Sequence, residues 1–173
     1  PCKFEHEFIP QVDELEQLVD ENTVAILYNF PSNPTGGTLN KLQRDELLEF
    51  AKKHDLWIIS DEVYDRIVFE GKHVSFMGTN YHKTLLVNSF SKTFAMTGWR
   101  IGYIISTNLE AMNQIIKMQY YITACSNDAM QYAVLEAMNE AADYPDVIAN
   151  EFKERCELIV ERLNSMPGVD CHK

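Results

Sequence analysis

The sequence contains little that would indicate a metal site or a membrane span. Its four cysteines, Cys2, Cys125, Cys156 and Cys171, form no CxxC pair, and this spacing argues against a zinc site. Scattered thiols in a chain that can build its own core are typical of a reducing compartment, so we expect a cytoplasmic protein. The longest mostly apolar stretch, Val24–Phe30, is far below the roughly 18 residues that a membrane-spanning helix needs.

Basic residues are also scarce. The chain has 26 acidic and 15 basic residues, which gives a net charge of −11. Such a surface repels phosphate backbones and anionic lipids, so we expect neither a nucleic-acid partner nor a membrane partner. The glycine-rich signatures G-x-G-x-x-G and G-x-x-x-x-G-K-[ST] are absent. The sequence therefore gives no support to a dinucleotide or nucleoside-triphosphate site.

The composition is that of a folded domain. Of 173 residues, 46% are hydrophobic and 24% are charged, which excludes disorder as the default and allows a substantial core. The sequence begins with Pro1 instead of Met and ends at Lys173 without a closing element. A trimmed form of a small complete protein would explain both ends. The motifs described below favour a fragment of a larger polypeptide.

Apolar runs alternate with amphipathic stretches along the chain. Strands are predicted at 24–30, 56–59, 84–87 and 101–105, the last of them reached by a loop. Helices are predicted at 13–19 and around 112–119, 133–141 and 145–163. Another helix is predicted to begin after an N-cap at Asn40, with Gln43 three residues on. This alternation predicts an α/β domain with a mainly parallel sheet and helices on both faces, a three-layer α/β/α arrangement.

Polar side chains follow three of the predicted strands. Asn33 follows the first, Asp61 and Tyr64 follow the second, and the segment 89–92 follows the third. Each residue alone has an ordinary explanation, since most lysines are solvated and an aspartate after a strand is often a helix cap. Together they lie where α/β sheets bind ligands, beyond the carboxyl ends of the strands.

The combination of motifs is more specific than any one of them. The sequence contains N-P-T-G at 33–36, D-E-V-Y at 61–64, S-F-S-K at 89–92 and G-W-R-I-G at 98–102. In this order and spacing they closely resemble the fold type I aminotransferases that use pyridoxal 5'-phosphate, the aspartate aminotransferase superfamily. The resemblance extends over nearly the whole chain, from residue 13 to residue 168.

The resemblance implies a chemical role for four residues. Lys92 would hold the cofactor as an internal Schiff base and, once released by substrate, would act as general base for the substrate Cα proton. Asp61 would pair with the pyridine nitrogen and keep it protonated. Tyr64 and Asn33 would hydrogen-bond the phenolic oxygen of the ring. Lys92, Asp61 and Tyr64 are thus the expected catalytic residues.

The same resemblance implies a phosphate site. Ser89 and Arg100 would bind the cofactor phosphate, for which the forked guanidinium is well suited. Ser91 would also approach it. The residues expected to bind the cofactor are therefore Asn33, Asp61, Tyr64, Ser89, Ser91, Lys92 and Arg100.

The family pattern also implies what surrounds this chain. Residues 1–173 would form part of the large, cofactor-binding domain, incomplete at both ends, with 145–173 leading toward a small domain. The intact enzyme would be a homodimer, and the isolated chain would be inactive because parts of the site lie outside it. In this family the strand at 101–105 runs antiparallel to its neighbour, so we expect the same here.

Three functions are compatible with these residues. The first is an aminotransferase acting on an amino acid and a 2-oxo acid, with aspartate or aromatic substrates favoured. The second is a carbon–sulfur lyase of the same superfamily, although D-E-V-Y at 61–64 favours a transaminase, because the lyase branch more often resembles D-E-I-H. The third is a non-catalytic α/β interaction domain in which Lys92 has no chemical role.

Overall fold

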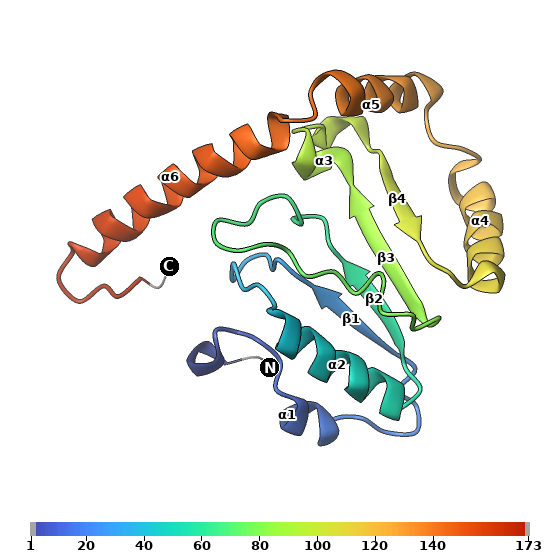
Figure 1. Cartoon of the computed structure of the whole chain (residues 1–173), viewed down its shortest axis with the longest axis horizontal. Coiled ribbons are helices and arrows are strands. Elements are labelled where there is room, and N and C mark those ends of the chain that lie inside the picture. The colour runs from blue at the N-terminus through green and yellow to red at the C-terminus, as the bar shows by residue number, and fades with distance from the viewer. Residues whose placement is uncertain (1–2, 172–173) are drawn as a thin grey trace.

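A four-stranded sheet organises the computed structural model, which describes residues 3–171. Pro1, Cys2, His172 and Lys173 lie outside the described residues. The strands are β1 (Ala25–Asn29), β2 (Trp57–Asp61), β3 (Thr84–Ser89) and β4 (Gly102–Ile105), and they lie in the sheet in that order (Figure 1). The first three strands are parallel, and β4 is antiparallel to β3. The predicted α/β class, the mainly parallel sheet and the direction of the fourth strand are confirmed.

The helices lie close to the predicted positions. They are η1 (Phe4–His6), α1 (Val12–Glu16), α2 (Lys41–Lys53), α3 (Phe90–Thr93), η2 (Thr97–Trp99), α4 (Leu109–Thr123), α5 (Asp128–Glu140) and α6 (Tyr144–Asn164). One expectation needs correction, because the connection between β3 and β4 contains the short helices α3 and η2 and is not simply a loop. A helix of four residues leaves almost no periodicity in a sequence, so hydrophobic pattern alone does not reveal it.

The predicted helix start at Asn40 is a complete capping box. The Gln43 backbone N–H donates to Asn40 Oδ1 at 2.9 Å, and the Asn40 N–H donates to Gln43 Oε1 at 2.8 Å. Two backbone donors that the helix itself cannot satisfy are thereby paired. The apolar face of α2 that follows is buried, with Leu47 and Ala51 at its centre.

The hydrophobic core lies between α2 and one face of the sheet. Tyr28 and Ile58 point into it from β1 and β2, and Phe76 stacks on the Tyr28 ring at a centroid distance of 5.2 Å. Side chains alternate between the faces of a strand, so Leu27 points to the opposite face, where it is 66% exposed. The described helices α1 and α2 therefore cover one face of β1 and β2.

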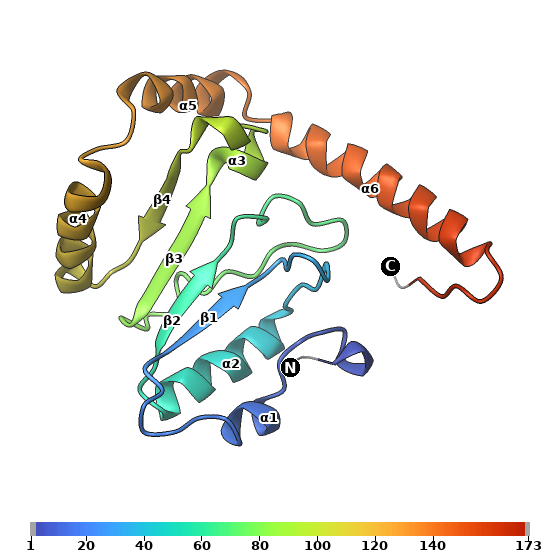
Figure 2. The ribbon, with the colours of Figure 1, turned by 180° about the vertical axis from the view of Figure 1, so that it is seen from behind.

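Of the longer helices that remain, α4 and α5 lie toward the β4 side of the sheet. α4 runs alongside β4, α5 follows it, and α6 extends away from the sheet, as the front and back views both show (Figure 1, Figure 2). Within residues 3–171, no helix is long and apolar enough to cross a membrane.

Candidate active site

The carboxyl ends of the parallel strands bring the predicted polar residues to one edge of the sheet. In the strand register, Asn29 lies opposite Asp61, and Asp61 lies opposite Val87. Ser89 is two residues beyond Val87 on β3 and so lies on the same face as Asp61. The Asp61 and Ser89 side chains, 28 positions apart in the sequence, are thus placed on one face at one end of neighbouring strands.

Three of the predicted residues lie next to one another at this edge. Asn33 Nδ2 donates a hydrogen bond of 3.2 Å to Tyr64 Oη. The ammonium group of Lys92 lies 5.6 Å from the centroid of the Tyr64 ring, within the range of a cation–π contact. The loop after β1, the segment after β2 and helix α3 after β3 therefore meet around the Tyr64 side chain.

Asn29 connects two of these segments, and the sequence analysis did not identify it. Its Oδ1 accepts the backbone N–H of Asn33 at 3.1 Å, and its Nδ2 donates to the backbone carbonyl of Asp61 at 3.3 Å. The Asp61 carboxylate in turn accepts the Val63 N–H at 3.2 Å through Oδ1. An amide side chain as the last residue of an apolar strand is the signal that could have found Asn29.

The second group of predicted residues lies around the start of α3. Ser89 is the N-cap of this helix, and its Oγ accepts the Ser91 N–H at 3.3 Å. Thr97, a residue that the sequence analysis did not single out, joins the group to η2. Its hydroxyl donates to the Ser91 carbonyl at 3.2 Å, and its own carbonyl accepts from Arg100 Nη1 at 2.8 Å. Ser89, Ser91 and Arg100 thus belong to one hydrogen-bonded loop.

The backbone of the G-W-R-I-G motif is constrained at two points. Arg100 adopts a left-handed conformation with φ 54° and ψ 47°, which is unfavourable for a residue with a side chain. At Gly102, an added Cβ would lie 2.7 Å from the Asn88 carbonyl oxygen and 3.1 Å from Ser89 Cβ. The final glycine of the motif is required because β4 approaches β3 this closely.

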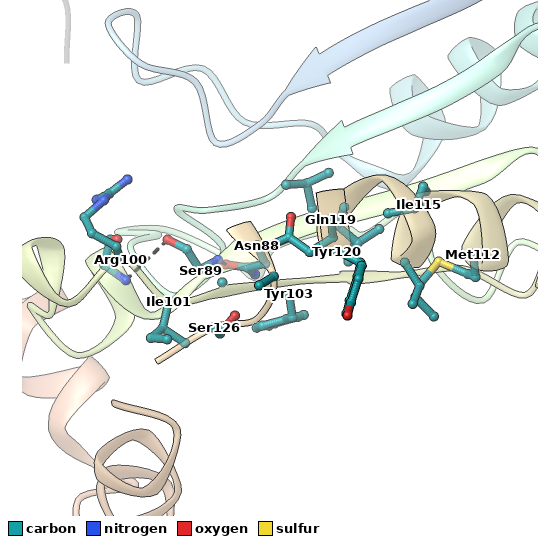
Figure 3. A pocket seen from close by; sticks show the side chains of 16 residues that line it. Asn88, Ser89, Arg100, Ile101, Tyr103, Met112, Ile115, Gln119, Tyr120 and Ser126 are labelled. Carbon is teal, nitrogen blue, oxygen red and sulfur yellow. Dashed lines mark hydrogen bonds between the residues drawn. The ribbon is translucent and has the colours of Figure 1, made fainter. Parts of the chain in front are cut away.

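A groove of about 600 Å³ opens between α4 and the β3–β4 pair. Ser89, Ser91 and Arg100 line it, with Arg100 at one end and Met112 at the other (Figure 3). Asn33, Asp61, Tyr64 and Lys92 are not among the lining residues. The structure therefore places three of the seven predicted residues on the groove and the other four at the adjoining edge of the sheet.

The side of the groove formed by β4 carries a neutral phenol. Burial raises the pKa of Tyr103, and the negative charges of Asp65 and Glu62 raise it further. Tyr103 therefore stays protonated at neutral pH and can donate a hydrogen bond.

The donor set fits pyridoxal 5'-phosphate. Ser89 Oγ accepts from Ser91, so the hydroxyl hydrogen can be donated, and Arg100 uses one nitrogen for Thr97 and has further N–H groups to offer a phosphate. Tyr64 Oη accepts from Asn33 and can likewise donate its proton. Asp61 Oδ2 can accept from a protonated ring nitrogen, and Lys92 supplies a primary amine. A phosphate, a pyridinium, a phenolic oxygen and an aldehyde each find a chemically matched partner.

Sequence comparison identifies the family. The family described as aminotransferase class I and II matches residues 1–173, and the chain belongs to this family. It is 39% identical over 171 residues to the aspartate aminotransferase of Pyrococcus abyssi, with 96% of this chain and 44% of the relative aligned. It is 38% identical over 171 residues to aromatic-amino-acid aminotransferase 2 of Thermococcus litoralis, with the same coverage.

Solved structures show the same fold. The aromatic aminotransferase of Pyrococcus horikoshii superposes with a TM-score of 0.90 at 36% identity, over 96% of this chain and 46% of that one. The aspartate aminotransferase of Thermus thermophilus with maleate gives a TM-score of 0.90 at 30% identity, over 95% and 44%. The chain spans less than half the length of these relatives.

Proposed function

We propose that the protein containing this chain is a pyridoxal 5'-phosphate-dependent aminotransferase that transfers an amino group between an amino acid and a 2-oxo acid. The observation that carries the proposal is the meeting of three segments around Tyr64, where Asn33 bonds the hydroxyl and Lys92 lies over the ring. One sheet edge provides an amine, a phenol and an amide, and Asp61 and Ser89 lie beside them on a shared face. These are the functional groups that this chemistry requires.

Each side chain has a role in holding the cofactor. Ser89 and Arg100 would bind the phosphate, with Ser91 beside them, and Asp61 would hold the proton on the ring nitrogen. Asn33 and Tyr64 would hydrogen-bond the phenolic oxygen, and Lys92 would be the point of covalent attachment. When bound, the cofactor supplies an electron sink for the substrate's Cα electrons.

The proton that leaves the substrate Cα needs a base, and Lys92 Nζ is the group proposed for it. Lys92 lies on α3, the four-residue helix that follows β3, and the Ser89 cap fixes the start of this helix. A general base acts efficiently when its position is fixed within hydrogen-bond reach of the proton that it removes. The short helix α3 therefore serves to hold this amine at the end of the sheet.

The proposed substrates are aspartate or an aromatic amino acid with a 2-oxo acid as acceptor. The named activities of similar proteins, aspartate and aromatic-amino-acid aminotransferase, support this choice. We further propose a cytoplasmic homodimer, in accordance with the scattered thiols and the resemblance on which the dimer expectation rests.

The segment 145–173 is proposed to lead from the cofactor-binding domain to a smaller domain. Arg66 Nη2 and Asp146 Oδ1 are 2.9 Å apart, and Pro145 is fully buried, so the first turn of α6 is attached to the segment after β2. Farther along α6, the apolar side chains of Phe152 and Ile159 are exposed. A helix that is held at one end and has an exposed apolar side is suited to pack against a further domain.

The test uses the intact protein. Pyridoxal 5'-phosphate is added, the visible absorbance is followed, and borohydride reduction with peptide mapping locates the attached group. Attachment at Lys92, lost in Lys92→Ala and retained in Lys83→Ala, supports the proposal, and attachment at another lysine contradicts it. Turnover of aspartate that depends on 2-oxoglutarate supports transamination, whereas sulfur release without an oxo acid would indicate the lyase. No cofactor binding would favour the interaction domain.

A further inference from the structure

A buried carboxylate lies directly beside the proposed site. Glu62 is 2% exposed. Its Oε1 accepts three hydrogen bonds, from Ser60 Oγ at 2.8 Å, from Ser75 Oγ at 3.0 Å and from the Phe76 N–H at 3.1 Å. Its Oε2 lies 2.6 Å from His73 Nε2. Both oxygens are therefore held by fixed partners.

This arrangement keeps a charge inside the protein. Burial raises the pKa of Glu62, but the hydrogen bonds from His73, Ser60 and Ser75 outweigh burial and hold the pKa below its ordinary value of 4.5. A buried ionic group is weak evidence for stability, because apolar residues of similar volume often stabilise a fold as well or better. Its more specific effect is to allow one geometry for the segments that it joins.

The joined segments carry two residues of the proposed site. Glu62 links the end of β2 to residues 73–76, and so closes the intervening segment into a loop that contains Tyr64. The Glu62 N–H donates to the Val87 carbonyl at 2.9 Å, and the Glu62 carbonyl accepts the Asp65 N–H at 2.9 Å. The Tyr64 carbonyl accepts the Ile67 N–H at 2.8 Å. Both the side chain and the backbone of Glu62 thus define the path of residues 61–67.

The alternation along β2 sets the direction of each side chain. Ser60 and Glu62 are buried on the core side, and Asp61 between them points to the other face. Any rotation of the chain at Glu62 would turn Asp61 as well. The core therefore fixes the orientation of the carboxylate that is proposed to meet the cofactor.

We propose that Glu62, held by His73, Ser60 and Ser75, is a positioning residue that sets the orientation of Asp61 and Tyr64 without touching the cofactor. This inference rests on the proposed function. It predicts that removal of the Glu62 carboxylate weakens cofactor binding by more than the accompanying loss of stability explains.

The experiment compares four variants of the intact protein. Glu62→Ala removes every bond, Glu62→Gln keeps an oxygen that can accept at the Oε1 position, and His73→Ala removes one partner. Leu47→Ala is the matched control, because Leu47 is 1% exposed on α2 and belongs to the hydrophobic core, but makes none of the hydrogen bonds of Glu62. The dissociation constant for pyridoxal 5'-phosphate and the visible spectrum are measured where each variant is folded. Amide hydrogen exchange of residues 63–67 is measured without cofactor.

Glu62→Ala should raise the dissociation constant and speed amide exchange at 63–67 by about tenfold each. Leu47→Ala should change neither, although it lowers the melting temperature, and Glu62→Gln should restore most of both. Equal cofactor affinity and equal local exchange in Glu62→Ala and Leu47→Ala would overturn the inference. Should Glu62→Ala fail to fold, His73→Ala replaces it, with smaller shifts in the same direction, and no shift in that variant overturns the inference too.

The two proposals can fail separately. A wild-type protein that binds no pyridoxal 5'-phosphate contradicts the proposed function, and amide exchange at 63–67 then decides whether Glu62 orders the segment. A wild-type protein that binds the cofactor, together with a Glu62→Ala variant that binds it equally well, contradicts the positioning role alone.

Discussion

Asn33 and Tyr64 are joined by a hydrogen bond of 3.2 Å across a separation of 31 residues. The amide nitrogen of Asn33 is the donor, so the phenol of Tyr64 remains able to donate its own proton. The bond fastens the loop after β1 to the segment after β2, and Lys92 reaches the same ring from α3. One side chain, Tyr64, therefore connects three segments of the site.

Tyr64→Phe should weaken cofactor binding with little effect on stability. The ring that faces Lys92 remains, but Asn33 loses its acceptor and the cofactor loses a donor, so the dissociation constant for pyridoxal 5'-phosphate should rise about tenfold. Tyr81→Phe is the control, since Tyr81 Oη donates to the Leu56 carbonyl at 2.7 Å away from the proposed site. It should lower the free energy of unfolding and leave the affinity unchanged. The same affinity in both variants would argue against a role for the Tyr64 hydroxyl.

Asp61→Asn should abolish most turnover while the protein remains folded. The amide oxygen can still accept the Val63 N–H, so the free energy of unfolding should change by no more than about 0.5 kcal/mol. A neutral amide cannot hold the proton on the ring nitrogen, and the lost charge-assisted bond is worth about 1.5–3 kcal/mol. Asp45→Asn on α2 gives the same change in net charge and should leave turnover intact. Near-wild-type turnover of Asp61→Asn would show that the carboxylate has another role.

Two glycines of the G-W-R-I-G segment should respond differently to a methyl group. In Gly102→Ala, the new Cβ would lie 2.7 Å from the Asn88 carbonyl oxygen, so β4 must move, at a cost of about 1–3 kcal/mol. In Gly98→Ala, the Cβ would meet no heavy atom within 4 Å, and the change should stay within about 0.5 kcal/mol. Urea unfolding of the two variants measures the difference. Equal losses in the free energy of unfolding would mean that β3 and β4 leave room for a methyl group at position 102.

The Glu62 carboxylate should make stability depend on pH in the acid range. Its pKa in the folded state is below the ordinary 4.5, so its stabilisation is fully present above pH 4.5. As the pH falls, the unfolded chain takes up the proton first, and the stabilisation is lost as the pH passes the folded-state pKa. The free energy of unfolding should therefore decline more steeply below pH 4.5 in the wild type than in Glu62→Gln. Exposed carboxylates are the same in both proteins, and parallel curves would show that Glu62 gains no such stabilisation.

Local chemistry in the sequence predicted most of the framework. The apolar run Val24–Phe30 and the turn formers after it give β1 and its loop, and Asn40 with Gln43 gives the start of α2, because both patterns depend on residues near in the sequence. The motifs also predicted residues that the fold brings together, since strand ends meet at one edge of a parallel sheet.

Contacts between distant segments were harder to predict. In the sequence, Asn29 is only the polar last residue of a strand, and Glu62 is only a residue just after one. The role of Asn29 depends on Asn33 and that of Glu62 depends on His73, and only the fold fixes the positions of these partners. Thr97 is similar, because its contact with Ser91 exists only once α3 and η2 form. The assigned roles of the seven site residues remain predictions, and the proposed variants test those of Lys92, Asp61 and Tyr64.

The left-handed backbone at Arg100 sets stability against function at this position. Glycine adopts this conformation without the steric penalty of about 1–2 kcal/mol that other residues incur. A thermostability design that ranks substitutions by folding energy alone would therefore favour Arg100→Gly, and would remove the guanidinium proposed to bind phosphate. Position 100 should be held fixed in such a design, since a gain in melting temperature there would come with loss of the proposed phosphate contact.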